Sequence, residues 1–277
     1  MIRVGESERG RALAALRDAP APIFLQSNLA QHGLAGDHPH ALHLWRNADF
    51  TAFAGLTVSG VLMPQMAGAS DADWRGLAEA LSGRAISGMN GDAAQLLRLM
   101  DLLALHDAPV QMQKTEPGFD LALSDLIVPD MAGLRLIPAR ADLRDMLIDW
   151  RSTYLTEVQN QPADTALTRA AGDIDLYLAA GSHRVLYHHD QPVALTGFNA
   201  ELPHQVQIGG VFTPHALRGR GYARAAVAAH LVQARDRGVT RANLFAANDA
   251  AARAYVAIGF RPAAPVRLVI FATPQVP

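Results

Sequence analysis

A loop rich in glycine and arginine, residues 218–223 (Arg-Gly-Arg-Gly-Tyr-Ala), carries the chemistry most easily read from this chain. It follows a β-prone run that ends near Pro214 and leads into a segment with apolar residues at helical spacing. Glycines can turn backbone N–H groups inward, and a helix start adds unpaired N–H donors and the positive end of the helix dipole. Arg218 and Arg220 add positive charge. The sequence therefore predicts a pyrophosphate-binding loop before a helix over residues 222–237.

A second group of polar residues follows the next β-prone run, residues 242–247. Asn248 or Asp249 is placed to cap a short Ala-rich helix over residues 249–258, with Gly259 at its expected end. Tyr255 lies in that helix, and a phenol with a pKa near ~10 can give a proton or a hydrogen bond to a leaving group. Two plainer interpretations stay open: Asn248 as a helix cap alone, and Tyr255 as a core residue.

Together the two segments resemble the GNAT superfamily of N-acetyltransferases. Arg218, Gly221 and Ala223 match its pattern Q/R-x-x-G-x-G/A, and Asn248, Tyr255 and Gly259-Phe260 match N-x(6)-Y-x(3)-G-F. The resemblance implies acetyl-CoA as cosubstrate, no metal, and Tyr255 as the general acid. The cofactor-binding residues that it implies are Val211, Phe212, Thr213, Arg218, Gly219, Arg220, Gly221, Tyr222, Ala223 and Asn248.

The strand before the loop, residues 206–212, is interrupted by Gly209 and Gly210, a pair that predicts a bulge. The resemblance implies that the pantetheine arm pairs with the backbone of Val211 and Thr213. Where the family often has a glutamate as base, this chain has Gln207, whose amide cannot accept a proton usefully. The identity of the general base is therefore left open. The candidates are a chain of water molecules and five side chains: His183, His188, His189, Glu201 and His204.

The first half of the chain contains short echoes of the second. Residues 60–64 resemble 210–214, residues 84–85 resemble 241–242, and residues 90–94 resemble 248–251, in the same order and at nearly constant offset. These echoes predict an ancient duplication. The first copy has no arginine and one glycine between Pro64 and Ser70, and Leu97 stands opposite Tyr255 at an offset of 158. We expect a degenerate lobe that does not bind the cofactor.

Hydrophobic periodicity and turn residues predict two similar α/β lobes in tandem. The resemblance implies that both lobes are GNAT-like and that the α/β fold contains a mixed sheet. The predicted domains are residues 1–130, degenerate, and residues 134–277, carrying the intact motifs; Pro129, Asp130 and Gly133 interrupt the pattern between them. The remaining predicted helices cover residues 6–18, 71–81, 93–105 and 141–155, and the predicted strands cover residues 41–45, 51–56, 58–63, 184–188 and 193–199.

The composition of the 277 residues agrees with a compact enzyme. A net charge of −2 gives no general attraction to nucleic acid or to an anionic membrane, and the absence of cysteine excludes disulfides and covalent cysteine intermediates. No leader and no apolar run of ~20 residues is recognised, so the cytoplasm is the expected location. His32, His38, His40 and His43 lie close in sequence, but Pro39 interrupts them and no metal site is predicted.

The mechanism that these residues predict is direct transfer of an acetyl group to a primary amine in a ternary complex. Small amines, amino acids, antibiotics and peptide or protein amines all remain possible acceptors. The acidic residues of the helix at residues 142–157 weakly favour a cationic acceptor. Another acyl-CoA as donor and a CoA-binding module without turnover are the alternatives. The oligomeric state is left open.

Overall fold

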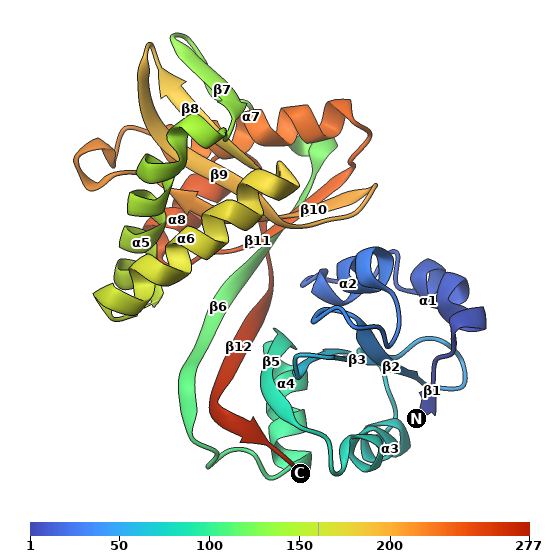
Figure 1. The fold of residues 1–277 in the computed structure, drawn as a ribbon. Coiled ribbons are helices and arrows are strands. Elements are labelled where there is room, and N and C mark those ends of the chain that lie inside the picture. The colour runs from blue at the N-terminus through green and yellow to red at the C-terminus, as the bar shows by residue number, and fades with distance from the viewer. Residues whose placement is uncertain (160) are drawn as a thin grey trace. The chain divides into compact units, whose positions relative to one another are not determined.

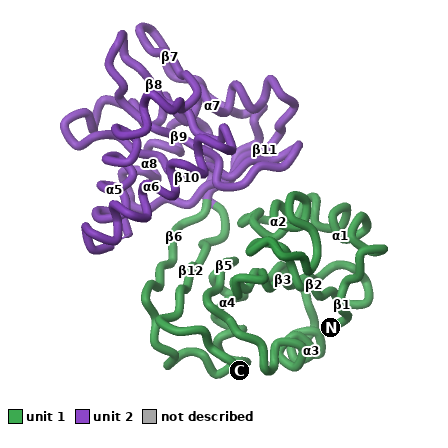
Figure 2. The backbone as a smooth tube through the Cα atoms, in the orientation of Figure 1, with its two compact units in different colours: residues 1–118, 263–277 green, residues 119–262 purple. Residues whose placement is uncertain are grey.

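The computed structural model describes residues 1–159 and 161–277. The chain divides into two compact units (Figures 1 and 2). Unit 1 comprises residues 1–118 and 263–277, and unit 2 comprises residues 119–262. Each unit has its own helices and apolar core and holds a consecutive part of one 12-stranded sheet order, so the units are described separately.

In unit 1 the strand order is β1-β2-β3-β4-β5-β12-β6. Strands β2, β3 and β4 are antiparallel, whereas β4 and β5 are parallel. The helices are α1 (Arg9–Ala15), α2 (Phe24–His32), α3 (Asp71–Leu81) and α4 (Ala93–Leu102). The strands are β1 (Ile2–Arg3), β2 (Leu42–Arg46), β3 (Phe53–Thr57), β4 (Val61–Gln65), β5 (Ile86–Asp92) and parts of β6 (Val110–Ala122) and β12 (Arg261–Gln275).

In unit 2 the strand order is β6-β11-β10-β9-β8-β7. Strands β7 to β10 are antiparallel, whereas β10 and β11 are parallel. The helices are α5 (Arg144–Gln159), α6 (Ala163–Ala180), α7 (Tyr222–Asp236) and α8 (Asp249–Val256). The strands are β7 (Leu134–Pro138), β8 (His183–His188), β9 (Gln191–Glu201), β10 (Gln205–Phe212) and β11 (Arg241–Phe245), with the end of β6.

The two units repeat one topology, because β2-β3-β4-α3-β5-α4 and β8-β9-β10-α7-β11-α8 have the same order and the same strand directions. A parallel pair needs a crossover, and α3 and α7 supply it. The predicted mixed α/β fold with two similar lobes is confirmed.

The division into units differs from the predicted domains, residues 1–130 and 134–277. The chain passes from unit 1 to unit 2 within β6 and returns within β12, so residues 263–277 belong to unit 1. There β12 pairs antiparallel with β5, from Val266↔Asp92 to Ile270↔Gly88. The sequence prediction assumed two contiguous domains, and pairing between strands more than 170 residues apart violates that assumption.

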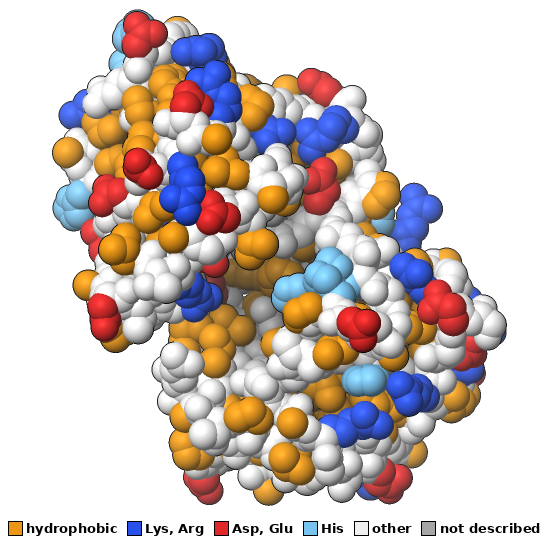
Figure 3. Space-filling model, in the orientation of Figure 1, with side chains coloured by type: hydrophobic (Ala, Val, Ile, Leu, Met, Phe, Trp, Pro, Cys, Tyr) orange, Lys and Arg blue, Asp and Glu red, His pale blue; other side chains and the backbone are white. Residues whose placement is uncertain are grey.

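The regular elements with strong periodicity lie where they are predicted. Helix α3 has the predicted bounds, and α7 and α8 end one or two residues early. Helices α2 and α6 and strands β5, β6, β7 and β12 were not predicted. On the surface drawn in Figure 3, acidic and basic side chains alternate without a large region of one sign, as the small net charge implies.

The returning strand β12 supplies core residues to unit 1. Val269 is 0% exposed and Phe271 is 4% exposed, and both pack in the cluster that contains Trp45 and Trp74. Residues on the solvent side of this segment, such as Val276, are exposed instead. The core of unit 1 therefore depends on the last residues of the chain.

We predict that Phe271→Ala lowers the free energy of unfolding of unit 1 by about 3–5 kcal/mol, because it leaves a cavity in this core. Urea unfolding followed by the fluorescence of Trp45 and Trp74, in a Trp150→Phe background, measures this unit. Val276→Ala is the control and should change the midpoint little. An unchanged midpoint for Phe271→Ala would show that unit 1 folds without β12.

Candidate functional site

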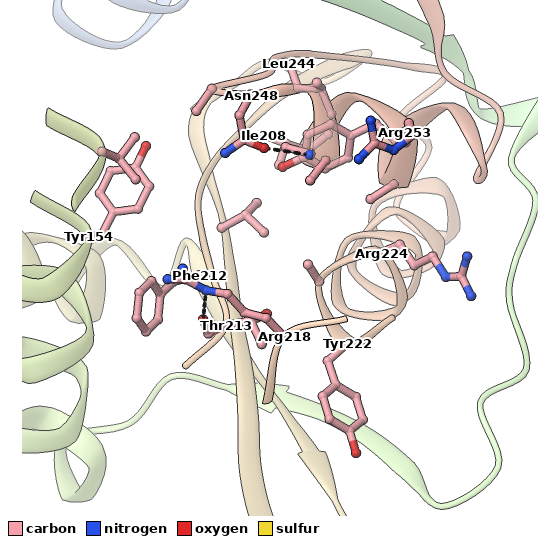
Figure 4. A pocket seen from close by; sticks show the side chains of 18 of the residues that line it. Tyr154, Ile208, Phe212, Thr213, Arg218, Tyr222, Arg224, Leu244, Asn248 and Arg253 are labelled. Atoms are coloured by element: carbon pink, nitrogen blue, oxygen red, sulfur yellow. Dashed lines mark hydrogen bonds between the residues drawn. The ribbon is translucent and has the colours of Figure 1, made fainter. Parts of the chain in front are cut away.

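The site begins where two parallel strands of unit 2 separate. Strands β10 and β11 pair only from Gln205↔Arg241 to Gln207↔Asn243. Beyond this last pair, a cavity of about 1120 Å³ opens between the strands (Figure 4). Its walls come from the end of β10, the loop before α7, the start of α8 and the C-terminal turns of α5.

Strand β10 carries the predicted bulge. Gly209 pairs with Gly197 and Phe212 with Leu195, so Gly210 and Val211 together face Thr196 on β9. Gly210 has φ +63°, a left-handed conformation that favours glycine. The bulge removes Gly210 and Val211 from the regular register with β9, and both residues line the cavity.

Glycines at the bulge make room for a buried histidine. A Cβ atom on Gly197 would lie 2.1 Å from His183 Nε2, and one on Gly210 would lie 2.8 Å from the same atom. The His183 ring stacks on Tyr177 at 3.6 Å, and its Nδ1 lies 2.9 Å from Ser182 Oγ. His183 therefore fills a slot beneath the bulge and fixes its backbone from below.

The loop after β10 and the start of α7 expose a row of backbone donors. Gly219 and Gly221 have φ values of +79° and +81°, and no side chain caps α7. The N–H of Arg218 donates to His215 O, and that of Ala225 donates to Gly221 O. The six N–H groups between them, of residues 219–224, have no hydrogen-bond partner among the residues that the structure describes. Their donors and the helix dipole converge on the cavity wall, which suits an anion.

The equivalent helix start in unit 1 is closed. Ser70 caps α3: its Oγ accepts from the N–H of Asp73, whose carboxylate accepts from the N–H of Ser70. These bonds lower the pKa of Asp73 below its usual value, the Ser70 hydroxyl most strongly. Asp71 adds a second carboxylate to the first turn, whereas α7 has none there. The charge and the donors that make α7 an anion site are thus absent from α3.

Arg218 is held at the mouth of the cavity. Its Nε donates to Thr213 O at 3.0 Å, and a terminal nitrogen donates to Glu157 Oε2 at 2.5 Å. Its guanidinium also lies over the ring of Phe212, 5.8 Å from the ring centroid. Arg218 thereby joins the loop to β10 and to α5. Val211, Phe212 and Thr213, for which cofactor binding is predicted, line the cavity.

The other predicted loop residues also line the cavity: Gly219, Arg220, Gly221, Tyr222 and Ala223. The hydroxyl of Tyr222 lies 3.0 Å from His188 Nδ1, and Figure 4 shows this side chain directed away from Asn248. The backbone of Tyr222, rather than its phenol, is therefore the part that serves the anion site.

Asn248 and Tyr255 lie on the opposite wall. Asn248 caps α8, because its Oδ1 accepts from the N–H of Ala251 at 2.9 Å. Tyr255 is 7% exposed, packs edge-on against Phe260, and lines the cavity. Asn248 is therefore a helix cap and Tyr255 is a core residue, as the plainer interpretations predict. Each residue also borders the cavity.

The counterpart of Tyr255 in unit 1 is Leu99 rather than Leu97. Asp92 caps α4 as Asn248 caps α8, which sets the offset between the units at 156 (248 − 92). Leu99 is fully buried, whereas Leu97 is exposed. The offset of 158 predicted from the sequence is therefore two residues too large. With either offset, the residue in unit 1 that corresponds to Tyr255 is a leucine.

The side chains considered as bases lie away from the cavity. His183 is buried beneath the bulge, His188 contacts Tyr222, and Glu201 pairs with Arg237. His189 follows β8, and His204 precedes β10. None of these is among the described residues that line the cavity. Gln207 is 1% exposed and occupies the last paired position before the strands separate.

The cavity is also lined by three residues of α5 that were not predicted for the site: Tyr154, Glu157 and Val158. Apolar spacing predicts a helix here but does not show which of its faces meets a distant strand. Among the described residues, no group of three or more His, Asp or Glu side chains could hold a metal ion. The stacked rings of His32 and His38 in unit 1 belong to no such group.

Unit 2 thus has an antiparallel meander followed by a parallel strand pair, and its open end faces an uncapped helix start. Residues 144–260 match the family model described as the acetyltransferase (GNAT) family. This segment is a GNAT acetyltransferase domain, as its motifs indicate. No curated protein matches the chain.

Solved structures share the whole fold at low sequence identity. A Drosophila protein is 14% identical, with 98% of this chain and 97% of that chain covered and a TM-score of 0.63. A tandem GNAT protein from the clavulanic acid biosynthesis pathway is 14% identical, with 99% and 98% covered and a TM-score of 0.56. A GNAT-family acetyltransferase from Colwellia psychrerythraea is also 14% identical, with 97% and 98% covered and a TM-score of 0.54. Both units therefore recur together in other proteins.

Within the described part of the chain, no helix combines the length and the apolar character needed to span a membrane.

Two buried histidines should make unit 2 sensitive to acid. Burial lowers the pKa of His183 from 6.5 to about 3, assisted by Arg151, and lowers that of His230 to about 2, assisted by Arg184. Both are therefore neutral in the folded protein below pH 6.5, where the unfolded chain binds a proton at each. The free energy of unfolding then falls as pH falls, by about 1.4 kcal/mol per pH unit for each histidine.

We predict that His230→Leu reduces this slope by about 1.4 kcal/mol per pH unit between pH 6 and pH 4. Urea unfolding at several pH values, followed by the fluorescence of Trp150, measures it. His215→Gln, at an exposed position, should leave the slope unchanged. A slope that is the same in His230→Leu and in the unaltered protein would contradict the buried neutral state of His230.

Proposed function

We propose that the protein is an acetyl-CoA-dependent N-acetyltransferase that transfers the acetyl group directly to a primary amine. The observation that carries this proposal is the set of unpartnered N–H groups at residues 219–224, beside the separated strands β10 and β11. Unpartnered N–H groups suit the binding of a diphosphate. Separated strands leave a backbone edge with which an extended arm that carries amide groups can pair. The acetyltransferase domain over residues 144–260 supports the same function.

The chain holds the two ends of acetyl-CoA with different elements. The loop from Arg218 to Ala223 binds the pyrophosphate through backbone N–H groups, with Arg220 adding charge. The backbone of Val211 and Thr213 pairs with the pantetheine amides as an additional strand would. Phe212 lies between them, with its ring against Trp150 on the opposite face. Asn248 contacts the arm from the other side while it caps α8.

The reaction makes a C–N bond and breaks a C–S bond. The amine nitrogen attacks the thioester carbonyl, whose oxygen becomes negative and is stabilised by the N–H of Val211 in the bulge. Tyr255 then donates its proton, or a hydrogen bond, to the departing thiolate. The amine gives up its proton to water or to a side chain. Holding both reactants in line supplies much of the acceleration.

Unit 1 acts as a GNAT-like partner domain without a cofactor site. Its α3 start is closed by Ser70 and Asp73, and Leu99 stands where unit 2 has Tyr255. A tandem GNAT protein among the solved structures has the same two-unit extent, which supports this view.

Binding of acetyl-CoA should stabilise unit 2 and depend on Gly221. A ligand at about 100 times its Kd adds roughly 2.7 kcal/mol to the free energy of unfolding. We predict a rise in melting temperature with acetyl-CoA and with CoA that disappears in Gly221→Glu, because the carboxylate occupies the anion site. Gly68→Glu is the matched control in unit 1, since Gly68 has φ +76° with open space around it, and should keep the rise. Absence of any rise with the folded, unaltered protein at millimolar ligand would refute the cofactor site.

Turnover distinguishes an enzyme from a CoA-binding module. The module is the alternative, because a protein without turnover does not need a base at position 207, where this chain has glutamine. We predict that Tyr255→Phe lowers kcat at least tenfold and leaves the stabilisation by CoA unchanged, because the phenol acts only on the leaving thiolate. Release of free thiol with a panel of amines measures kcat. Stabilisation by acetyl-CoA without thiol release from any amine would support the binding module instead.

A further inference from the structure

Unit 2 has a row of polar side chains on the sheet face opposite to the core beneath α7. Gln205 pairs in register with Arg241, and Gln207 with Asn243. Neighbouring residues in register point to the same side of a sheet, and the residues that alternate with them belong to the apolar core that includes Val227. These four polar side chains therefore share one face, at the closed end of the separated strands.

Asp120 on β6 joins the same row. It stands between Phe119 and Leu121, which both belong to that apolar core, so its own side chain faces the other way. Strand β6 is the neighbour of β11. The charge of Arg241 lowers the pKa of Asp120 and partly offsets the effect of burial, so the two groups are close enough to interact electrostatically.

Two buried amides of the row, those of Asn243 and Gln205, have no hydrogen-bond partner among the residues that the structure describes. Asn243 is 0% exposed and Gln205 is 1% exposed, and neither the oxygen nor the nitrogen of either amide makes a hydrogen bond. Oδ1 of Asp120 is likewise buried without a partner. Unpaired buried polar groups cost free energy, and four such amide atoms beside one carboxylate need an explanation.

The two charged side chains of the row have no ion-pair partner in the part of the chain that the structure describes. Within the described chain, Asp120 and Arg241 form no ion pair with each other or with another side chain. Burial raises the pKa of Asp120 above its usual value, and Arg241 offsets this only in part. A carboxylate, a guanidinium and two amides thus lie on one face of the sheet, beside the point where β10 and β11 separate.

We propose that this row is the acceptor subsite and that the acceptor is an amino acid. Asp120 binds the ammonium group, Arg241 binds the carboxylate, and the amides of Asn243 and Gln205 bond to the polar atoms between. A zwitterion satisfies both charges at once, whereas a simple amine leaves the guanidinium unpaired and a simple acid leaves the carboxylate unpaired. The proposal rests on the acetyltransferase function proposed above, because it names the acceptor of that reaction.

Direct binding tests the subsite without turnover. Amino acids are titrated by calorimetry into the protein saturated with CoA, which carries no acetyl group. We expect at least one amino acid to bind, and its methyl ester and its decarboxylated amine to bind at least tenfold more weakly. Asp120→Asn and Arg241→Gln should each weaken the amino acid at least tenfold. Asp125→Asn and Arg261→Gln, which alter an exposed ion pair in the same unit, are the matched controls.

Kinetics give the second measurement. With acetyl-CoA, Arg241→Gln should raise KM for the amino acid at least tenfold and leave KM for the decarboxylated amine unchanged, a split that a merely structural role does not produce. Stabilisation by CoA should be the same in all variants. Failure of every amino acid to bind the CoA complex, or equal effects of the test and control variants, overturns the subsite. Loss of stabilisation by CoA in the unaltered protein would instead refute the proposed function.

Discussion

The end of the parallel pairing between β10 and β11 is the constraint on which the site depends. After Gln207↔Asn243 the strands separate, and the bulge at Gly210 and Val211 lies in the part of β10 beyond this point. The separation opens the cavity and leaves the β11-facing edge of this part of β10 outside the parallel ladder. The glycines at 197 and 210 permit this geometry only together with His183, whose ring occupies the space that two Cβ atoms would need.

The two units show how one topology gains or lacks a site through helix capping. Both have a parallel strand pair joined by a helix, and in both the helix starts near the separated ends. Ser70 and Asp73 satisfy the first amides of α3 and add negative charge, whereas Gly221 leaves those of α7 unpaired. Capping stabilises a helix, so the open start of α7 gives up stability for a binding function.

The local features of this chain could be predicted from its sequence, and the long-range ones could not. The loop at 218–223, the cap at Asn248 and the helix bounds of α3 follow from short patterns. Helix α6 was missed because its buried face is Ala166, Ala170 and Ile174 while Leu167 and Leu176 are exposed, which obscures the apolar stripe. Strand β12 was missed because it contains three prolines (Pro262, Pro265 and Pro274) and pairs with β5, far away in the sequence.

The departure at Gln207 takes on a different meaning once its neighbours are known. Read alone, a glutamine at the position of a common glutamate suggests lost catalysis. In the sheet, Gln207 is one of a row of amides with a single carboxylate, Asp120, on the other side of Asn243's strand. A glutamate at 207 would add a second negative charge to a buried face that already holds one, and each would raise the pKa of the other. A glutamine keeps Asp120 as the one anion of the row, which a site for one ammonium group requires.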